Sequence, residues 1–209
     1  MTETPPTNLN TLRSHIADRL ADAITNRDAG WRTPTLATIG IDGGPRARTV
    51  VLRSVDVLRC RLLIYTDQRS AKMHEIKATD RVALSFWDAH INQQLRLTGR
   101  ASVVPPGPDV NAAWVALPVA SRLPYLVGLP PGHHLTQPDC NQPENRGGRA
   151  LTPAETDDGR DVFTLLAIVW TAWDWLWVGR SEHRRAQWNW EPADNPQAVG
   201  DCQGNWVVP

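Results

Sequence analysis

The segment YTDQRSAK, residues 65–72, gathers hydroxyl, amide and cationic side chains between a hydrophobic run and a segment that looks helical. Ser70 precedes the expected helix, and Lys72 lies in its first turn. A helix N-terminus offers unpaired N–H groups and the positive end of the helix dipole, so it attracts anions. A lysine at this place disfavours the helix slightly unless an anion neutralises it. On these residues alone, the favoured interpretation is a simple N-cap at Ser70 and a solvated Lys72.

A second set of cations lies in RARTVVLR, residues 46–53. Strand alternation places Arg48 on one face, whereas Arg53 falls on the other face unless a bulge re-aims it. Arginine matches phosphate through a two-pronged fork of N–H donors. Arg48, Ser70 and Lys72 would form a phosphate cup if the strand ends that carry them are neighbours. The alternative is that the arginines are surface charges on an edge strand.

Hydrophobic periodicity predicts the elements that must position these residues. A helical period runs over residues 9–26, with Asn8 in the capping position, and shorter helices are expected at 71–78 and 109–117. Elsewhere the period is two, and residues 42–44 and 89–92 are expected to turn two hairpins. The predicted strands are 35–41, 46–53, 61–66, 82–87, 93–104, 162–171, 174–178, 183–190 and 206–208.

Residues 128–160 are rich in Pro, Gly and Asn and show little periodicity, so they are expected to form a long loop, either a functional lid or a disordered segment. No internal repeat or linker divides the chain. Residues 1–209 are therefore expected to form one domain, with residues 1–30 holding the N-terminal helix. Many short strands with few helices predict a mainly β (α+β) fold, a single antiparallel barrel decorated by helices.

The composition argues against several classes of partner. The formal net charge is zero, which disfavours binding to nucleic acid or to an anionic membrane. No apolar run reaches membrane-spanning length, and the polar N-terminus does not resemble a signal peptide. Cys60, Cys140 and Cys202 are widely spaced and odd in number, so we expect reduced thiols and a cytoplasmic location.

Four motifs stand in order along the chain: RTVVLR at 48–53, YT at 65–66, SAK at 70–72 and QLRLTG at 94–99. Together they resemble the pyridoxamine 5′-phosphate oxidase-like flavoproteins, strongly over residues 30–104 and more weakly from residue 162 onward. The resemblance implies a six-stranded antiparallel split β-barrel with flanking helices. It also implies a homodimer with FMN bound at the subunit interface.

The resemblance also implies site residues. Arg48, Ser70 and Lys72 would bind the FMN phosphate, and Gln94 would hydrogen-bond the edge of the flavin ring. The implied cofactor-binding set from the first half of the chain is Arg48, Thr49, Val50, Val51, Leu52, Arg53, Tyr65, Thr66, Ser70, Lys72 and Gln94. Such a set suits a flavin, which needs an anion cup, an apolar slab and polar groups at its pyrimidine side.

The second half supplies WDWLWVGRSEHRRAQW, residues 173–188. Alternation puts the tryptophans on one strand face and Asp174 on the other. By the resemblance, Trp175 and Arg185 would reach the FMN of the partner subunit, and His183 would line the substrate pocket. The alternatives are a packed core and dimer interface for the tryptophans, and a structural role for His183.

The substrate side departs from the vitamin oxidase itself. Arg53 stands in the place of a phosphate-binding lysine, and Arg122 is the loosely aligned match to the substrate arginine. The remaining substrate-binding places are occupied by Pro118, Leu126 and Ser181. FMN binding is therefore expected, whereas pyridoxamine phosphate is doubtful as the substrate, as in the family's oxidase-related branch. His183 and Arg122 are the catalytic candidates.

Two functions follow from these residues. The first is an FMN-dependent oxidoreductase acting on a small substrate. The second is a non-catalytic protein on the same barrel, such as a flavin carrier, a haem-handling relative or a redox sensor; a deazaflavin is a third cofactor to consider. His133, His134 and Cys140 lack the spacing of metal ligands, so no metal site is expected.

Overall fold

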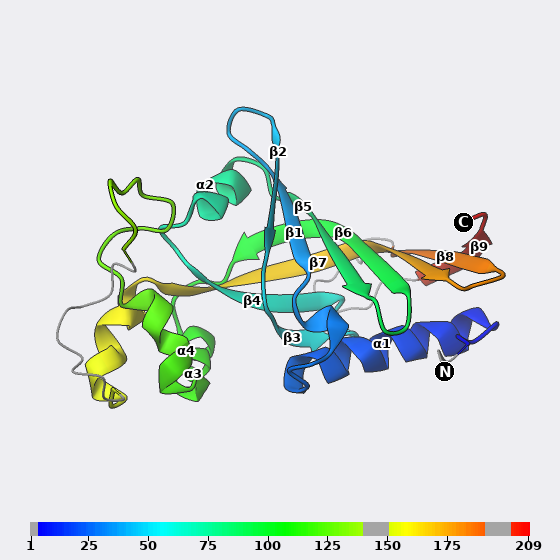
Figure 1. Ribbon diagram of the computed structural model, residues 1–209, viewed down its shortest axis with the longest axis horizontal. Coiled ribbons are helices and arrows are strands. Elements are labelled where there is room, and N and C mark those ends of the chain that lie inside the picture. The colour runs from blue at the N-terminus through cyan, green and yellow to red at the C-terminus, as the bar shows by residue number, and fades with distance from the viewer. Residues whose placement is uncertain (1–3, 140–150, 191–201) are drawn as a thin grey trace. The chain divides into compact units, whose positions relative to one another are not determined.

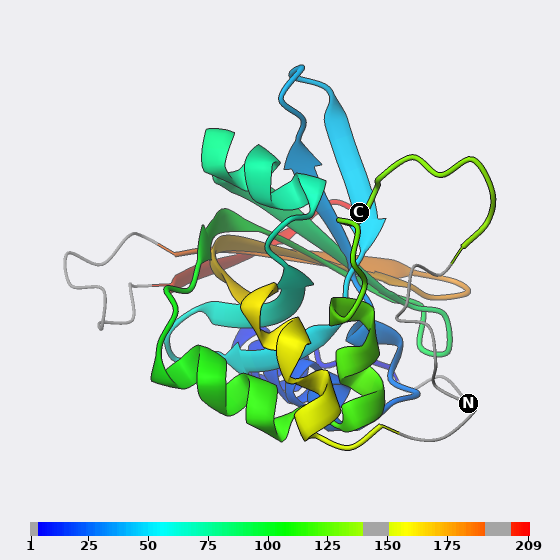
Figure 2. The same ribbon diagram turned by 90° about the vertical axis from the view of Figure 1, so that its left-hand side faces the viewer.

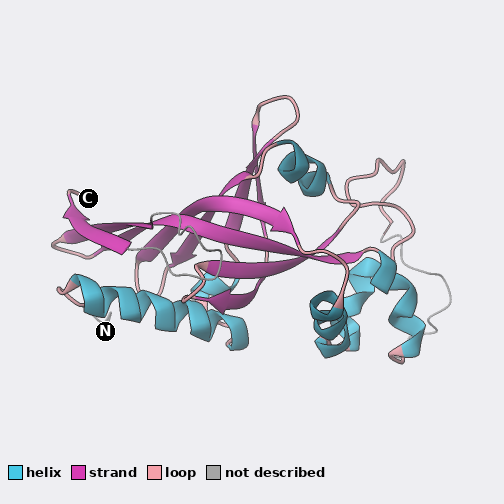
Figure 3. Ribbon diagram, turned by 180° about the vertical axis from the view of Figure 1, so that it is seen from behind, coloured by secondary structure: helices cyan, strands magenta, loops and turns pink. Residues whose placement is uncertain are grey.

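The computed structural model describes residues 4–139, 151–190 and 202–209, which fall into two compact units. Unit 1 comprises Met1–Ile64, Glu75–Ser102 and Ala167–Pro209, and unit 2 comprises Tyr65–His74 and Val103–Leu166. Unit 1 carries most of the β-structure, drawn as magenta arrows in Figure 3. No helix among the described residues is both long and apolar enough to cross a membrane.

The sheet contains nine strands among the described residues, and the strand pairs with a recorded register are all antiparallel. The main path runs β2-β1-β5-β6-β7-β4-β3, and β8 and β9 extend it from β7 (Figure 1). The strands are β1 Thr35–Ile39, β2 Pro45–Thr49, β3 Leu52–Asp56, β4 Arg61–Asp67, β5 Arg81–Asp88, β6 Gln93–Val103, β7 Phe163–Val178, β8 His183–Trp190 and β9 Cys202–Val207. The expected mainly β fold is confirmed.

Strands β2 and β3 lie at opposite ends of this path, yet only Val50 and Val51 separate them in sequence. Three Cα–Cα steps join Thr49 to Leu52, so at most about 11 Å can separate the two edges at this point. The sheet must therefore curl until its two edges nearly meet. Because no ladder joins β2 to β3 in the sheet order, the barrel stays open there, as expected for a split barrel.

Strand β7 contributes several large side chains to the unit 1 core. Its side chains alternate, so Trp173, Trp175 and Trp177 are buried at 6% exposure or less, as the sequence predicted. Trp188 and Trp190 of β8 join them, and ring centroids within the cluster formed with Trp170 lie 5.0–6.4 Å apart. Tilted and edge-on ring pairs of this kind add to the burial of apolar area.

Helix α1, Leu9–Thr25, packs against β3 in unit 1 (Figure 1). The Asn8 side chain accepts hydrogen bonds from Asn10 N and Thr11 N at 2.9 and 3.2 Å, which confirms the predicted cap. Its apolar stripe, Leu12, Ile16, Leu20 and Ala23, is fully buried. Helix α2, Ala71–Ala78, matches its predicted bounds.

Unit 2 is built from short helices (Figure 2) around one aromatic cluster. These are α3 Pro108–Ala116, α4 Val119–Arg122 and the 3-10 segments η2 Leu123–Tyr125 and η3 Ala154–Asp161. Phe163 contacts the rings of Tyr65, Trp114 and Tyr125 at 5.1–5.2 Å. These contacts give unit 2 a core of its own.

Four sequence predictions are corrected. The strand expected over 46–53 is two strands, because the chain leaves the β1 partner and joins β4 at Val50–Val51. The strands expected at 162–171 and 174–178 are one long strand, β7. The expected loop 128–160 contains η3 among its described residues, and the terminal strand begins at Cys202 instead of residue 206. The expectation of a single domain stays a prediction.

Gly99 of β6 marks the closest approach between β6 and β7. A Cβ at this position would lie 2.7 Å from Trp170 Cα and would overlap the Val169 carbonyl oxygen. Both neighbours are backbone atoms, so they cannot swing away. We expect Gly99→Ala to lower the free energy of unfolding by about 3 kcal/mol, measured by urea denaturation. Gly107→Ala is the matched control, because its Cβ would meet only Pro105 O at 3.9 Å; equal losses in the two variants would contradict the expectation.

Candidate functional site

The corner at residues 65–72 contains a small polar cluster within unit 2. Lys72 Nζ donates to Thr66 Oγ1 at 2.8 Å and to Ser70 Oγ at 2.9 Å. Thr66 and Ser70 are buried at 5% and 3% exposure, and Lys72 is half-buried. The ammonium is thus held over the first turn of α2 by two hydroxyls, where the dipole of the helix adds positive potential. Ammonium, hydroxyls and helix terminus together are donors of the kind that bind a phosphate.

The other polar residues of this corner anchor it within unit 2. The Gln68 backbone N–H and side-chain amide donate to Val162 O and Asp161 O at 2.8 and 2.6 Å. The Arg69 guanidinium pairs with Asp67 at 2.7 Å and also reaches the carbonyls of residues 127 and 128 at 3.1 Å. Ser70 Oγ donates to Asp67 O at 2.7 Å, so this hydroxyl fixes the turn. Within this corner, Gln68 and Arg69 anchor the chain, whereas Thr66, Ser70 and Lys72 form the polar cluster.

Arg48 lies on β2 in unit 1. Its guanidinium donates to the Thr38 hydroxyl, and its Nη2 lies 2.6 Å from Glu75 Oε2. Glu75 also accepts from Thr38 Oγ1 at 2.6 Å, and only 7% of its side chain is exposed. A buried carboxylate needs such donors to offset its lost hydration. The pairing fixes the direction of the Arg48 guanidinium, and 23% of the Arg48 side chain remains exposed.

The segment from Thr49 to Leu52 contains the crossing between the sheet edges. Val50 N–H donates to Pro34 O at 2.9 Å, and Leu52 is fully buried opposite Ile64. The register shifts between Leu52 and Ser54, so Arg53 stands at a bulge. The sequence left open whether Arg53 follows a regular strand or stands at a bulge, and the structure shows the bulge.

The other predicted residues of unit 1, Gln94, Trp175 and Arg185, lie on β6, β7 and β8. Gln94 Nε2 donates to Ser85 Oγ at 3.4 Å. Trp175 is fully buried, and its indole N–H donates to Gln93 Oε1 at 3.0 Å, so within this chain it is a core residue. Arg185 is bound to Asp174 by two hydrogen bonds, from Nε at 2.9 Å and from Nη2 at 2.7 Å.

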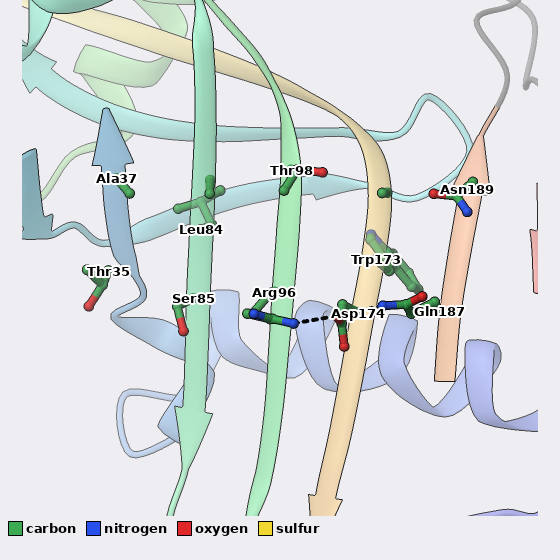
Figure 4. Close-up of a pocket in the computed structure, with 12 residues that line it drawn as sticks. Thr35, Ala37, Leu84, Ser85, Arg96, Thr98, Trp173, Asp174, Gln187 and Asn189 are labelled. Carbon is green, nitrogen blue, oxygen red and sulfur yellow. Dashed lines mark hydrogen bonds and ion pairs between the residues drawn. The ribbon is translucent and has the colours of Figure 1, made fainter. Parts of the chain in front are cut away.

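Asp174 gathers donors from the strands on both of its sides. Arg185 and Gln187 reach it from β8. Arg96 reaches it from β6, and Figure 4 shows Arg96 and Gln187 on either side of Asp174. Gln187 Nε2 lies 2.9 Å from Asp174 Oδ2. We call these four residues the Asp174 cluster. Burial raises the pKa of Asp174, but the hydrogen bonds from the two arginines and the glutamine outweigh it and bring the pKa from 3.8 to about 2.

A cavity of about 420 Å³ opens on this face of the unit 1 sheet (Figure 4). Arg96, Asp174 and Gln187 line its polar part, and Ala37, Ala83 and Leu84 contribute apolar surface. The small side chains on β1 and β5 leave the face hollow. A planar ligand with a polar edge, or the surface of another chain, has the shape and chemistry to fill such a hollow.

The two catalytic candidates differ in their surroundings. Arg122 in unit 2 is 6% exposed, and its guanidinium donates to Leu117 O, Thr156 Oγ1 and Val115 O at 3.0–3.1 Å. Its guanidinium carbon also lies 5.0 Å from the centre of the Trp114 ring. These contacts are those of an arginine that holds helices together. His183 of β8 in unit 1 is exposed, which leaves it accessible to a ligand.

No group of three or more acidic, histidine or cysteine side chains is arranged to hold a metal among the described residues. His133 and His134 are exposed in unit 2, and Cys140 lies outside the described residues.

Sequence reasoning missed the partners that hold the cationic side chains. Thr38 and Glu75 fix Arg48, and Asp174 fixes Arg185 and Arg96. One signal was present for Asp174, a lone acid between tryptophans on the polar face of a strand. Pairing with Arg96, 78 residues earlier, depends on strand order and has no local signal.

The comparisons with known proteins agree with this geometry. Residues 11–105 match the profile of the family described as "Pyridoxamine 5′-phosphate oxidase, FMN-binding domain". That stretch includes Arg48, Ser70, Lys72 and Gln94. Over residues 11–105 the chain therefore resembles the pyridoxamine 5′-phosphate oxidase-like family, and the family model that matches this segment is that of an FMN-binding domain.

Curated relatives are similar over part of the chain. A pyridoxine/pyridoxamine 5′-phosphate oxidase of Thermosynechococcus vestitus is 34% identical over 103 residues, which cover 49% of this chain and 47% of that protein. A pyridoxine/pyridoxamine 5′-phosphate oxidase 2 of Arabidopsis thaliana is 35% identical over 102 residues, covering 46% of this chain and 52% of that protein. The match spans about half the length of these relatives.

Solved structures share the fold along the whole chain. A pyridoxamine 5′-phosphate oxidase-related, FMN binding protein of Nostoc punctiforme superposes with a TM-score of 0.71 at 22% identity, covering 100% of both chains. PhzG of Burkholderia lata, solved in complex with tetrahydrophenazine-1-carboxylic acid, superposes with a TM-score of 0.68 at 17% identity, covering 98% of this chain and 94% of that one. At these identities the likeness establishes the split-barrel fold alone.

Each unit by itself holds residues whose chemistry fits a part of FMN. In unit 2 an ammonium and two hydroxyls meet at a helix N-terminus, which suits a phosphate. In unit 1 an amide at Gln94 and a guanidinium at Arg185 offer donors that suit the carbonyl-rich edge of a flavin ring. Both sets are held by hydrogen bonds to neighbouring side chains.

The Asp174 cluster makes stability depend on pH in the acid range. Because the folded pKa lies below the unfolded value, the cluster stabilises the fold fully above pH of about 4 and loses this contribution as pH falls toward about 2. We expect Asp174→Asn to be less stable than the parent at pH 6, with the difference shrinking toward pH 2. Urea denaturation across this range measures it. Asp18→Asn, at an exposed position on α1, is the control, and a difference that does not vary with pH would contradict the expectation.

Proposed function

We propose that the protein is an FMN-dependent oxidoreductase that acts on a small substrate. The observation that carries this proposal is the Lys72 ammonium, held by Thr66 and Ser70 over the first turn of α2, inside a segment that matches an FMN-binding domain. A lysine at a helix N-terminus opposes the helix dipole unless an anion compensates it. A phosphate ester is an anion of the right charge and size for that position.

Each predicted FMN residue then has a stated task. Lys72 and Ser70 donate to the phosphate, and Arg48, directed by Glu75, is the third phosphate donor that the family resemblance implies. The backbone from Thr49 to Leu52, at the sheet crossing, would face the flavin ring. Gln94 donates to the edge of the ring. Bound FMN would supply hydride or electron transfer, which no side chain of the protein provides.

We further propose that a second copy of the chain covers the hollow sheet face. The family relationship implies such a dimer, with Trp175 and Arg185 directed to the FMN of the partner. The cavity lined by small residues of β1 and β5 supports this arrangement, since small side chains allow another chain to approach closely. Arg185 is accessible for this role at 28% exposure. The buried Trp175 would act through its packing.

Pyridoxamine phosphate is not the substrate that these residues favour. Pro118 and Leu126 carry no donor in their side chains, and Ser181 replaces an arginine. Arg122, the remaining match, already donates to three acceptors and is buried. His183 is the residue best placed to meet a substrate, because it is exposed on the strand that also carries Arg185. Cytoplasmic localisation remains part of the proposal.

The differences at the substrate-binding positions also favour a second candidate function. This is a non-catalytic flavin- or haem-binding protein, or a redox sensor, on the same barrel. The two candidates differ in turnover and share the cofactor site. Rapid reduction of bound FMN by a small amine or a reduced nicotinamide supports the oxidoreductase. Tight binding without reduction by either class of donor supports the carrier or sensor.

The experiment that tests the proposed function is a visible absorption spectrum of the purified protein, with mass spectrometry of whatever heat releases. We expect a yellow protein that releases FMN and sediments as a dimer. A colourless protein that gains no thermal protection from added FMN would overturn the proposal. Preferential uptake of a deazaflavin in competition with FMN would replace the cofactor.

Replacing Lys72 shows whether its side chain binds the FMN phosphate or is only a charge at the surface. We expect Lys72→Ala to weaken FMN binding by roughly 1.5–3 kcal/mol, the scale of a hydrogen bond to a charged group. Lys77→Ala is the matched control, because Lys77 is exposed in the last turn of the same helix. Isothermal titration of the apoprotein measures both affinities. Identical affinities in the two variants would show that Lys72 does not bind the phosphate.

A further inference from the structure

Asp174 accepts more hydrogen bonds than a single ion pair at the surface would provide. Asp174 Oδ1 and Oδ2 accept the Nε and Nη2 hydrogens of Arg185, at 2.9 and 2.7 Å, which is the two-pronged geometry of strong arginine–carboxylate pairs. Oδ2 also accepts from Gln187 at 2.9 Å and from Arg96. Only 17% of the Asp174 side chain is exposed. Four donors from two strands thus converge on one carboxylate.

The arginines keep donors that Asp174 does not use. Within the described part of the chain, Nη1 of Arg185 and Nη1 of Arg96 have no hydrogen-bond partner. Arg96 is 48% exposed and Arg185 is 28% exposed, so both guanidinium groups border solvent. Two arginines and one aspartate give the cluster a net charge of +1. The carboxylate permits two cations to lie side by side that would otherwise repel each other.

Three members of the Asp174 cluster, all except Arg185, line the cavity. Trp173 and Trp175, on either side of Asp174 in sequence, point into the core, and alternation sends Asp174 to the opposite face. Arg96, Asp174 and Gln187 all line the 420 Å³ cavity (Figure 4). A partly covered site amplifies the effect of its charges, because water screens them less than at an open surface.

We propose that Asp174 is a positioning residue for the flavin site: it fixes Arg185 and Arg96 at the ring's polar edge and holds the local charge at +1, thereby setting the reduction potential of bound FMN. This inference rests on the proposed function. Reduced flavin carries negative charge at its pyrimidine side, so a nearby cation stabilises it relative to the oxidised form. The negative charge of Asp174 offsets one of the two arginines, and so reduces the stabilisation of reduced flavin relative to oxidised flavin.

The test is the midpoint potential of FMN bound to parent and variant, measured by redox titration against a reference dye. Asp174→Asn keeps the size of the side chain and removes its charge, taking the cluster from +1 to +2. We expect reduced FMN to bind about tenfold more tightly relative to oxidised FMN. This ratio equals a positive shift of about 30 mV for a two-electron couple.

Arg96→Gln changes the net charge of the cluster in the opposite direction. It provides a second test if Asp174→Asn does not fold. It takes the cluster from +1 to 0, so the potential is expected to fall. Asp42→Asn is the control, since Asp42 forms a comparable ion pair with Arg46, at 2.6 Å, in the exposed hairpin of unit 1. Its potential should equal that of the parent.

The outcomes separate this inference from the proposed function. A parent protein that does not bind FMN overturns the proposed function, and the inference with it. A parent that binds FMN, together with an unchanged potential in both Asp174→Asn and Arg96→Gln, overturns the inference alone. Loss of thermal stability in Asp174→Asn without a change in potential likewise shows a purely structural role.

Discussion

The two-residue crossing at Val50–Val51 constrains the whole of unit 1. It joins the two edge strands of the main sheet path, so the sheet has to curl, and the curled sheet then needs an interior filled by large side chains. Tryptophans of β7 and β8 are among the buried side chains of unit 1. The same crossing ends the pairing of β2 just after Arg48 and places a bulge at Arg53. The irregular backbone of the proposed flavin site therefore results from the curling of the sheet at the place where its two edges nearly meet.

The cationic residues of the site are each held by a neighbour of opposite or complementary chemistry. Thr66 and Ser70 hold Lys72, Glu75 holds Arg48, and Asp174 holds Arg185. Long flexible side chains lose conformational entropy when they bind a ligand, and partners that fix them beforehand reduce that cost. The arrangement fits a protein that keeps a charged cofactor in one orientation. Lys72, Ser70 and Arg48 all lie within residues 11–105, the segment that matches an FMN-binding domain.

Much of the fold could be predicted where the signal is local. Helix α1 carries its own period and its Asn8 cap, and α2 follows a clear turn, so both bounds were predicted within a residue or so. The crossing at Val50–Val51 could not be predicted, because the alternation of RARTVVLR continues through it. Strand β7 was divided in two since nothing local shows that one strand can pair with several neighbours. For the site, motif spacing predicted Lys72 and Arg48, whereas Glu75 and Asp174 depend on contacts between distant segments.

The tryptophan cluster of β7 and β8 has an optical consequence. Its indole rings lie 5.0–6.4 Å apart at fixed, tilted angles, close enough for their excited states to couple. A chiral, rigid array of this kind gives a near-ultraviolet circular dichroism band that exists only while the rings keep their mutual orientation. The tryptophan cluster thus gives a spectroscopic signal of its own, which distinguishes loosening of the ring packing from loss of the strands that carry the rings.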